Sequence, residues 1–170
     1  IAIPIGILSA VKKRTGADSA ITVALFVLYS LPTFWTAQVL LLSLTGGPAP
    51  WGGEWPDIFP TRGLNSEGMS WSSGDPKAIL DLFWHLILPV FCMTYGSLAF
   101  LSRQMRSAVL ETIKDDYIRT ARAKGLNDRT VILKHAVRNS LIPIITISAG
   151  LLPELIAGSI VIESIFNIPG

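Results

Sequence analysis

Few residues in this sequence could do chemistry, and their spacing does not build an active site. Cys92 is the single cysteine of the 170 residues, which excludes an internal disulfide and a cysteine zinc cluster. The two histidines, His85 and His135, leave little for a metal site, and no Gly-Lys-Ser/Thr phosphate-binding loop is present. The sequence therefore predicts no catalytic residue, no metal and no cofactor, and it predicts that this chain does not hydrolyse ATP.

Two carboxylates lie within an otherwise uncharged stretch near the end of the chain. Glu154 and Glu163 are the only formal charges of residues 141–166. Carboxylates are costly in lipid and mark functional sites by default. Glu154 is four residues from both Gly150 and Gly158 on a helix, and small residues mark close helix packing. Glu154 could line a polar path through a helix bundle or bond to a neighbouring helix near Pro153. Glu163 is expected to have a structural or interfacial role.

The elements that must hold these residues are membrane helices. Half of the residues are apolar, 15% are charged and the mean hydropathy is +0.51, whereas soluble domains carry about 25% charged residues. A stretch of about 20 apolar residues can cross the hydrocarbon core of a membrane. The sequence predicts an all-α, polytopic transmembrane helix bundle. The chain begins without Met, so we expect an internal fragment of one transmembrane domain, with spans at about 1–11 (partial), 20–44, 82–101 and 141–166.

The charges of the connecting segments alternate in sign. Residues 12–19 carry a net charge of +2, residues 45–79 of −2 and residues 102–140 of +5. Cytoplasmic loops carry an excess of Lys and Arg. We therefore expect 12–19 and 102–140 on the cytoplasmic side of the cell membrane and 45–79 outside, where Trp51, Trp55 and Trp71 suit the interface.

The loop at 102–140 is too long for a simple connector. Apolar or small residues recur every four positions, which predicts a helix along this line: Met105, Val109, Ile113, Tyr117 and Ala121. Gly125 is expected to end that helix, and Asn127 to cap a second helix over about 128–139. Such a hairpin could be a solvated charged loop or a docking element for a cytoplasmic partner, and its basic charge could also contact anionic lipid.

The loop also resembles that of a known family. The run Tyr117-Ile-Arg-Thr-Ala-Arg-Ala-Lys-Gly-Leu126 resembles the signature loop of permease subunits of binding-protein-dependent type I ABC importers. Gly125 fills the signature glycine, and Arg119, Thr120 and Ala121 stand at its Glu-Ala-Ala positions. Of these three residues only Ala121 matches the signature by identity. The residues that differ from it resemble the sequences of the dipeptide, oligopeptide and nickel branch, and so does the end of the chain with Gly158, Glu163 and Phe166.

The resemblance implies the type I ABC importer permease fold and a role in peptide transport. It implies that the short helix before Gly125 docks in a cleft of a separate ATPase, through Tyr117, Arg119, Thr120, Ala121, Lys124 and Gly125. Ala121 and Gly125 are small residues one turn apart, which would permit close approach to that partner. The implied partners are cytoplasmic ATPase subunits, a second permease subunit (a paralogue rather than an identical copy), an extracytoplasmic substrate-binding protein and membrane lipid, but no nucleic acid. The alternative is a channel or secondary carrier without an ATPase.

Overall fold

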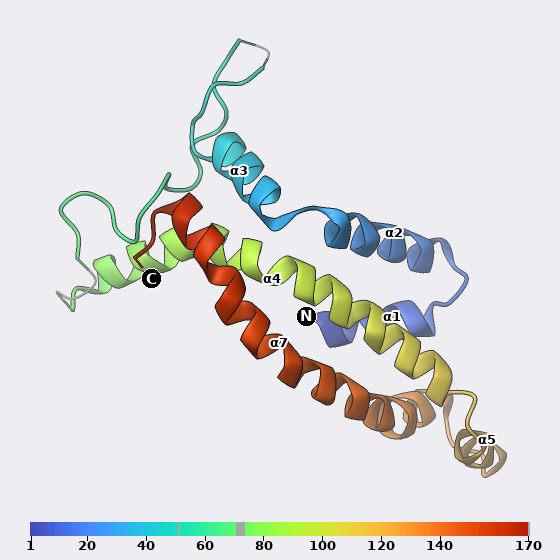
Figure 1. Cartoon of the computed structure of the whole chain (residues 1–170). Coiled ribbons are helices and arrows are strands. Elements are labelled where there is room, and N and C mark those ends of the chain that lie inside the picture. Colours follow the sequence, from blue (N-terminus) through green and yellow to red (C-terminus); the bar gives the residue numbers. More distant parts are fainter. Residues whose placement is uncertain (51, 71–73, 170) are drawn as a thin grey trace. The chain divides into compact units, whose positions relative to one another are not determined.

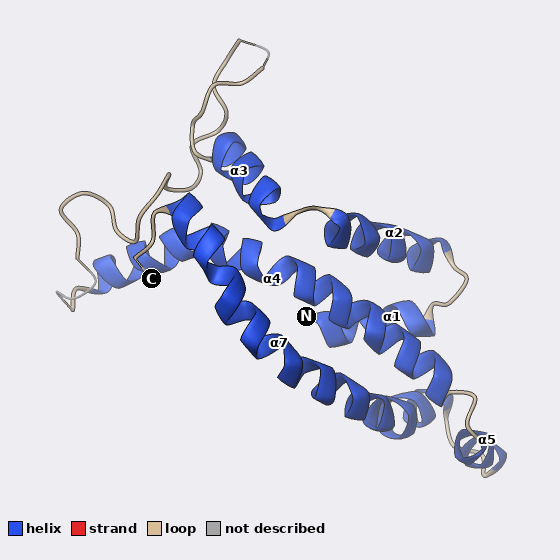
Figure 2. Cartoon of the chain, viewed as in Figure 1, coloured by secondary structure: helices blue, strands red, loops and turns tan. Residues whose placement is uncertain are grey.

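The computed structural model describes residues 1–50, 52–70 and 74–169, except for the side chains of 152 and 154–159. Within these residues the fold is built from helices, and the only β pairing is two isolated bridges. Figures 1 and 2 show these elements: α1 (Ala2–Val11), α2 (Gly16–Ser30), α3 (Thr33–Leu44), α4 (Pro76–Thr112), α5 (Asp116–Ala123), α6 (Asp128–Thr130), the π-helix η2 (Val131–Ala136) and α7 (Val137–Phe166). The predicted all-α class is confirmed. Trp51 and Trp71 lie outside the described residues.

Among the described residues, α4 is the one helix that by itself is long and apolar enough to cross a membrane. It contains the predicted span 82–101, with Pro89 inside the helix. The predicted span 20–44 passes the same test only if α2 and α3 are counted together. Helix α1 is apolar but short, and α7 covers the predicted span 141–166.

The expectation of one helix over 20–44 is wrong, because the chain breaks between α2 and α3 at Leu31 and Pro32. Proline disfavours the helical conformation of the residue before it and has no N–H of its own. The Tyr95 hydroxyl donates to the Leu31 carbonyl over 2.7 Å, so a carbonyl freed by the break has a partner. Tyr95 also lies 3.0 Å from the Thr36 hydroxyl in the first turn of α3. The tyrosine thus stabilises the break from 64 residues away in the sequence.

The chain divides into two compact units, and the first combines Ile1–Ser30 with Ser97–Glu154. In this unit α1 packs closely on α4, because Gly6 has no side chain: a Cβ there would lie 2.5 Å from the Ser102 carbonyl oxygen. The Ser102 hydroxyl donates to the Ala2 carbonyl over 3.1 Å. The core around this contact contains buried side chains from α1, α4 and α7: Ala10, Met105, Val109 and Ile144.

The second unit combines Leu31–Gly96 with Leu155–Gly170. Its core packs buried side chains of α3, α4 and α7: Ala37, Leu88, Cys92, Ile162 and Phe166. Cys92 is a fully buried packing residue. The His85 ring is also buried, and its Nδ1 donates to the Asp81 carbonyl over 2.8 Å. Gly63 N–H donates to the Phe166 carbonyl over 2.8 Å and ties the loop before α4 to the end of α7.

Candidate functional site

The single helix predicted from Met105 to Gly125 is in fact two helices. Helix α4 ends at Thr112, and α5 begins at Asp116 after a short turn. Asp115 takes the N-cap position of α5 with extended backbone angles, φ −64° and ψ 147°. Asp115 and Asp116 place two carboxylates at the N-terminus of α5, where the helix dipole favours negative charge. The four-residue pattern gave no sign of this turn, whereas the adjacent acids are a signal for it.

The turn changes which residue of α5 is buried. Met105 and Val109 of α4 are fully buried, as the pattern predicts. Tyr117 belongs to the same four-residue pattern and is expected to face inward. It is 39% exposed, whereas its neighbour Ile118 is fully buried. The predicted inward position is therefore wrong at Tyr117, where the break puts Ile118 inside instead, whereas Ala121 is buried as the pattern predicts.

Gly125 ends α5, as predicted, in the left-handed conformation with φ +76°. Its N–H donates to the Arg122 carbonyl over 2.9 Å, and the Leu126 N–H donates to the Ala121 carbonyl over 3.4 Å. These two bonds form a Schellman motif, which satisfies carbonyls at the end of a helix. A Cβ on Gly125 would meet nothing within 4 Å. Backbone conformation, and not a close contact inside this chain, is therefore what requires a glycine here.

The second arm of the hairpin starts at Asn127, as predicted. The Asn127 side chain accepts from the Arg129 N–H over 2.9 Å and caps α6. The expectation that this helix ends near residue 139 is wrong, since α6, η2 and α7 follow each other without a break up to Phe166. Pro143 lies inside α7 and does not interrupt it.

The two arms are held together by a small apolar core. Ile118 and Ala121 of α5 pack against Val131 and Ala136, all of them buried. Residues five apart are bonded to each other in a π-helix and so lie nearly above one another, which brings Val131 and Ala136 to the same face. Ala121 thus packs within the chain and is not free to approach a partner, contrary to the expectation for that residue. The Asn139 side chain donates to the Tyr117 hydroxyl over 2.8 Å and adds a polar link between the arms.

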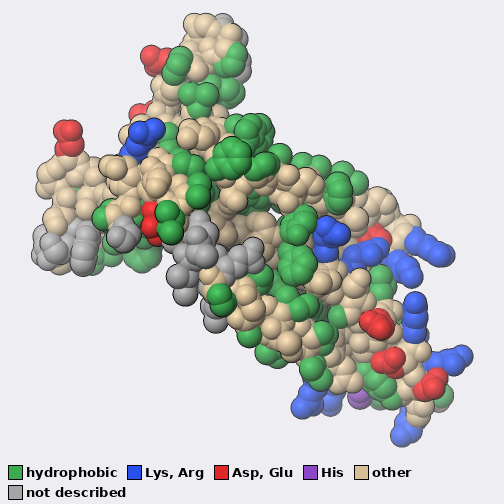
Figure 3. Space-filling view, in the orientation of Figure 1, with side chains coloured by type: hydrophobic (Ala, Val, Ile, Leu, Met, Phe, Trp, Pro, Cys, Tyr) green, Lys and Arg blue, Asp and Glu red, His purple; other side chains and the backbone are tan. Residues whose placement is uncertain are grey.

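The outer face of α5 carries the other predicted docking residues. Arg119, Thr120, Lys124 and Gly125 are all exposed. Arg119 pairs with Asp116 at 3.4 Å but its side chain remains 77% exposed. Figure 3 shows charged side chains gathered over α5 and the turn between α1 and α2. The hairpin therefore presents a polar surface on a rigid apolar base.

Glu154 and Gly158 lie in the described backbone of α7, but the side chain of Glu154 and the surroundings of both residues are outside what the structure describes. Glu163 is described and is half-buried. Its carbonyl accepts from the Ile168 N–H over 2.9 Å at the end of α7.

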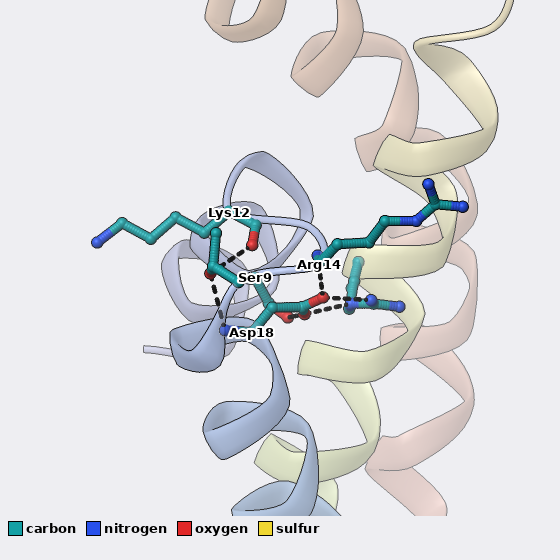
Figure 4. A network of polar contacts seen from close by, with 6 residues as sticks. Ser9, Lys12, Arg14 and Asp18 are labelled. Atoms are coloured by element: carbon teal, nitrogen blue, oxygen red, sulfur yellow. Dashed lines mark hydrogen bonds and ion pairs between the residues drawn. The ribbon is translucent and has the colours of Figure 1, made fainter.

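Sequence reasoning missed a buried ion pair in the first unit. The Asp18 carboxylate accepts two bonds from Arg106, from Nε over 3.0 Å and from Nη2 over 2.9 Å. It also accepts from the Ser9 hydroxyl over 2.6 Å and from the Arg14 N–H over 3.1 Å (Figure 4). Bonds from Arg106 above all, and then from Ser9, hold the pKa of Asp18 well below its usual range. The available signal was that Asp18 is the one acid in the basic segment 12–19.

The chain is similar to known transport proteins over nearly its whole length. The model of a family described as the binding-protein-dependent transport system inner membrane component matches residues 2–170. The chain is 38% identical over 170 residues to the oligopeptide transport system permease protein AppB of Bacillus subtilis, covering 100% of this chain and 49% of that protein. It is 36% identical over 171 residues to the dipeptide transport system permease protein DppB of Haemophilus influenzae, covering 98% and 51%. The chain thus spans about half the length of these relatives.

Proposed function

Because the chain belongs to the family of inner membrane components of binding-protein-dependent transport systems, we propose that it is part of the transmembrane subunit of an ATP-driven peptide importer. The peptide substrate is supported by the names of its relatives, which are oligopeptide and dipeptide permease proteins. The proposed partners are cytoplasmic ATPase subunits, a second, paralogous permease subunit and an extracytoplasmic substrate-binding protein. We further propose that the protein crosses the cell membrane several times.

The observation that carries this proposal is the hairpin of α5 with η2. A helix that transmits force from an ATPase must be rigid and firmly joined to a membrane helix. Helix α5 is only eight residues long, and isolated helices of that length are unstable in water. Here the Schellman motif at Gly125 caps its C-terminal end, and Ile118 and Ala121 anchor it to the helical run that continues into α7. A loop without a partner has no need of such an anchored helix.

Substitution of Gly125 tests the coupling role. The left-handed conformation costs a β-branched residue roughly 1–2 kcal/mol, so Gly125→Val should disrupt the end of α5. In proteoliposomes with the ATPase and the binding protein, we expect this variant to lose ATP-dependent peptide uptake or to lose the ATPase on purification. Gly125→Asn is the matched control, because Asn tolerates this conformation, and it should keep most of the uptake.

Normal uptake and normal ATPase co-purification in Gly125→Val would contradict the coupling role. Wild-type uptake that continues at full rate without ATP would instead favour a channel or secondary carrier.

Glu154 is proposed to line the translocation path and to contact a cationic group of the substrate, such as a peptide amine. The support is a carboxylate within a membrane segment, where lipid exposure would be costly. Glu154→Gln should lower uptake or change the preference among peptides while the complex still assembles. Uptake kinetics that stay the same across a peptide panel would assign Glu154 to helix packing.

A further inference from the structure

The turn between α1 and α2 carries three cations that have no counter-ion in the first unit. Lys12, Lys13 and Arg14 are all exposed. The one acid near them, Asp18, is paired with Arg106, whose Nη2 lies 2.9 Å from the carboxylate. Arg14 donates only its backbone N–H to that carboxylate, and Figure 4 shows the side chains of Lys12 and Arg14 extending away from it. Among the described residues, no ion pair includes any of the three cations.

The backbone that presents these cations is fixed by hydrogen bonds. The Thr15 N–H and the Thr15 hydroxyl both donate to the Lys12 carbonyl, over 3.1 Å and 2.7 Å. Arg14 has left-handed backbone angles, with φ +65°, which are uncommon for a residue other than glycine. Such a conformation persists only where the surroundings impose it, and here the Asp18 carboxylate accepts from the Arg14 N–H over 3.1 Å. The three cations therefore project from a defined turn.

Exposed apolar side chains lie next to this basic turn on both helices. They are Leu8 and Val11 of α1 and Val23 and Phe26 of α2. Leu8 precedes Lys12 by four residues, and residues four apart are neighbours on the surface of a helix. The Lys12 N–H still donates to the Leu8 carbonyl over 3.0 Å, so the helical geometry extends to Lys12. The surface thus places positive charge directly beside apolar side chains.

A phospholipid matches both parts of this surface. The predicted topology puts the turn at the cytoplasmic side of the membrane, between the spans 1–11 and 20–44. The cytoplasmic leaflet carries anionic lipids, which attract Lys and Arg only within about 8 Å of its surface. The acyl chains of the same lipid can cover the apolar side chains of α1 and α2. An acidic surface of a soluble protein would match the charge but not these apolar neighbours.

We propose that the turn at Lys12, Lys13 and Arg14 binds the headgroup of an anionic phospholipid, whose acyl chains lie along the exposed apolar side chains of α1 and α2. This inference rests on the membrane crossing in the proposed function and not on the peptide substrate. Lys and Arg donate charge-assisted hydrogen bonds to phosphate oxygens. The pair of Asp18 with Arg106 links the turn to α4. The stability of the importer is therefore expected to depend on anionic lipid.

The test follows the Tm of the purified complete importer in a neutral detergent while short-chain phosphatidylglycerol is added. A ligand that binds the folded state raises Tm. The double variant Lys12→Gln, Lys13→Gln should raise the lipid concentration that gives half of the Tm shift at least tenfold, because each cation near the headgroup contributes about fivefold in affinity. Phosphatidylcholine, which has no net charge, should act equally on the wild type and the variant.

The matched control is the double variant Lys114→Gln, Arg129→Gln. It removes the same amount of charge from two exposed cations of the hairpin and of the turn before it. Helix α4 extends about 16 Å beyond its predicted span before it reaches that turn, which is farther than the lipid potential acts. The half-point for phosphatidylglycerol should therefore stay at the wild-type value.

Three results would overturn the lipid site. An equal rise of the half-point in the control would assign the effect to overall charge and not to the turn. An unchanged half-point in Lys12→Gln, Lys13→Gln, even with a lower Tm in the absence of lipid, would assign the cations to a contact with protein. A shift of the same size with glycerol phosphate alone would assign the turn to a soluble anion. Wild-type protein that stays in the soluble fraction of broken cells would instead contradict the proposed function itself.

Discussion

Asp18 shows how one residue can join several segments of the first unit. Its carboxylate receives bonds from α1 through Ser9, from the following turn through the Arg14 N–H and from α4 through Arg106. The residue is 5% exposed, and a buried charge is tolerated only where it is paired and hydrogen-bonded. The network therefore fixes the turn between α1 and α2 to the part of α4 that leads to α5.

Asp18→Asn is expected to destabilise the purified complex, because Arg106 would lose its charged acceptor while partly buried. The drop in Tm should exceed that of Asp128→Asn, which removes an ion pair with Arg122 whose side chains are 44% and 75% exposed. Exposed pairs of that kind contribute roughly 0–1 kcal/mol. A drop in Tm for Asp18→Asn that is no larger than for the control would contradict the anchoring role.

The pH dependence of this difference has a defined sign. Because the Asp18 pKa is lowered in the folded state from 3.8, its stabilisation is complete above that value and is lost as the pH falls through the folded-state pKa. The difference in Tm between wild type and Asp18→Asn should stay constant from about pH 8 to about pH 5 and shrink only below about pH 4. If the difference in Tm disappeared near pH 6, the group that titrates would be a histidine and not Asp18.

At the scale of elements, the sequence identifies the helices but not all of their ends. The end of α5 at Gly125 and the start of α6 at Asn127 are predictable, because each end is encoded by the residue that forms it. The break at Pro32 depends on Tyr95, a distant partner that no local pattern reveals. Pro143 stays within a helix although its local signal resembles that of Pro32.

The candidate site was predictable to a similar degree. The exposed residues Arg119, Lys124 and Gly125 follow from the loop motif. The inward packing of Ile118 in place of Tyr117 does not, because it depends on the turn before α5 and on the π-helix opposite. Both features interrupt the regular α-helical repeat, and a pattern with a fixed period of four cannot represent such an interruption.

The contact between α1 and α4 provides a test at this scale. Gly6→Ala would place a methyl group 2.5 Å from the Ser102 carbonyl oxygen, so one of the two helices must move. Overpacking of this kind typically costs 1–3 kcal/mol. Thermal unfolding of the complex should show that loss, whereas Gly150→Ala, whose Cβ would meet nothing within 4 Å, should be neutral or slightly stabilising. Equal stabilities of the two variants would contradict the close packing.

At the scale of the whole molecule, we predict the orientation in the membrane from charge. The segment 45–79 is acidic, and the segments 12–19 and 102–140 are basic. In intact cells carrying Cys92→Ser, an impermeant thiol reagent should label Ser66→Cys and should leave Lys13→Cys unlabelled until the membrane is opened. Both positions are exposed in the structure, so burial would not hide either of them. Labelling of position 13 alone from outside would reverse the orientation.

The π-helix η2 allows the second arm of the hairpin to differ in length by one residue. A π-helical turn is equivalent to an α-helix that has gained one residue. If one residue were deleted between Val131 and Ala136, the two buried positions would stand four apart and would still share a face in an ordinary α-helix. Chains that differ by one residue in this stretch can therefore build the same hairpin. A single-residue gap there in an alignment of relatives would not mark a different structure.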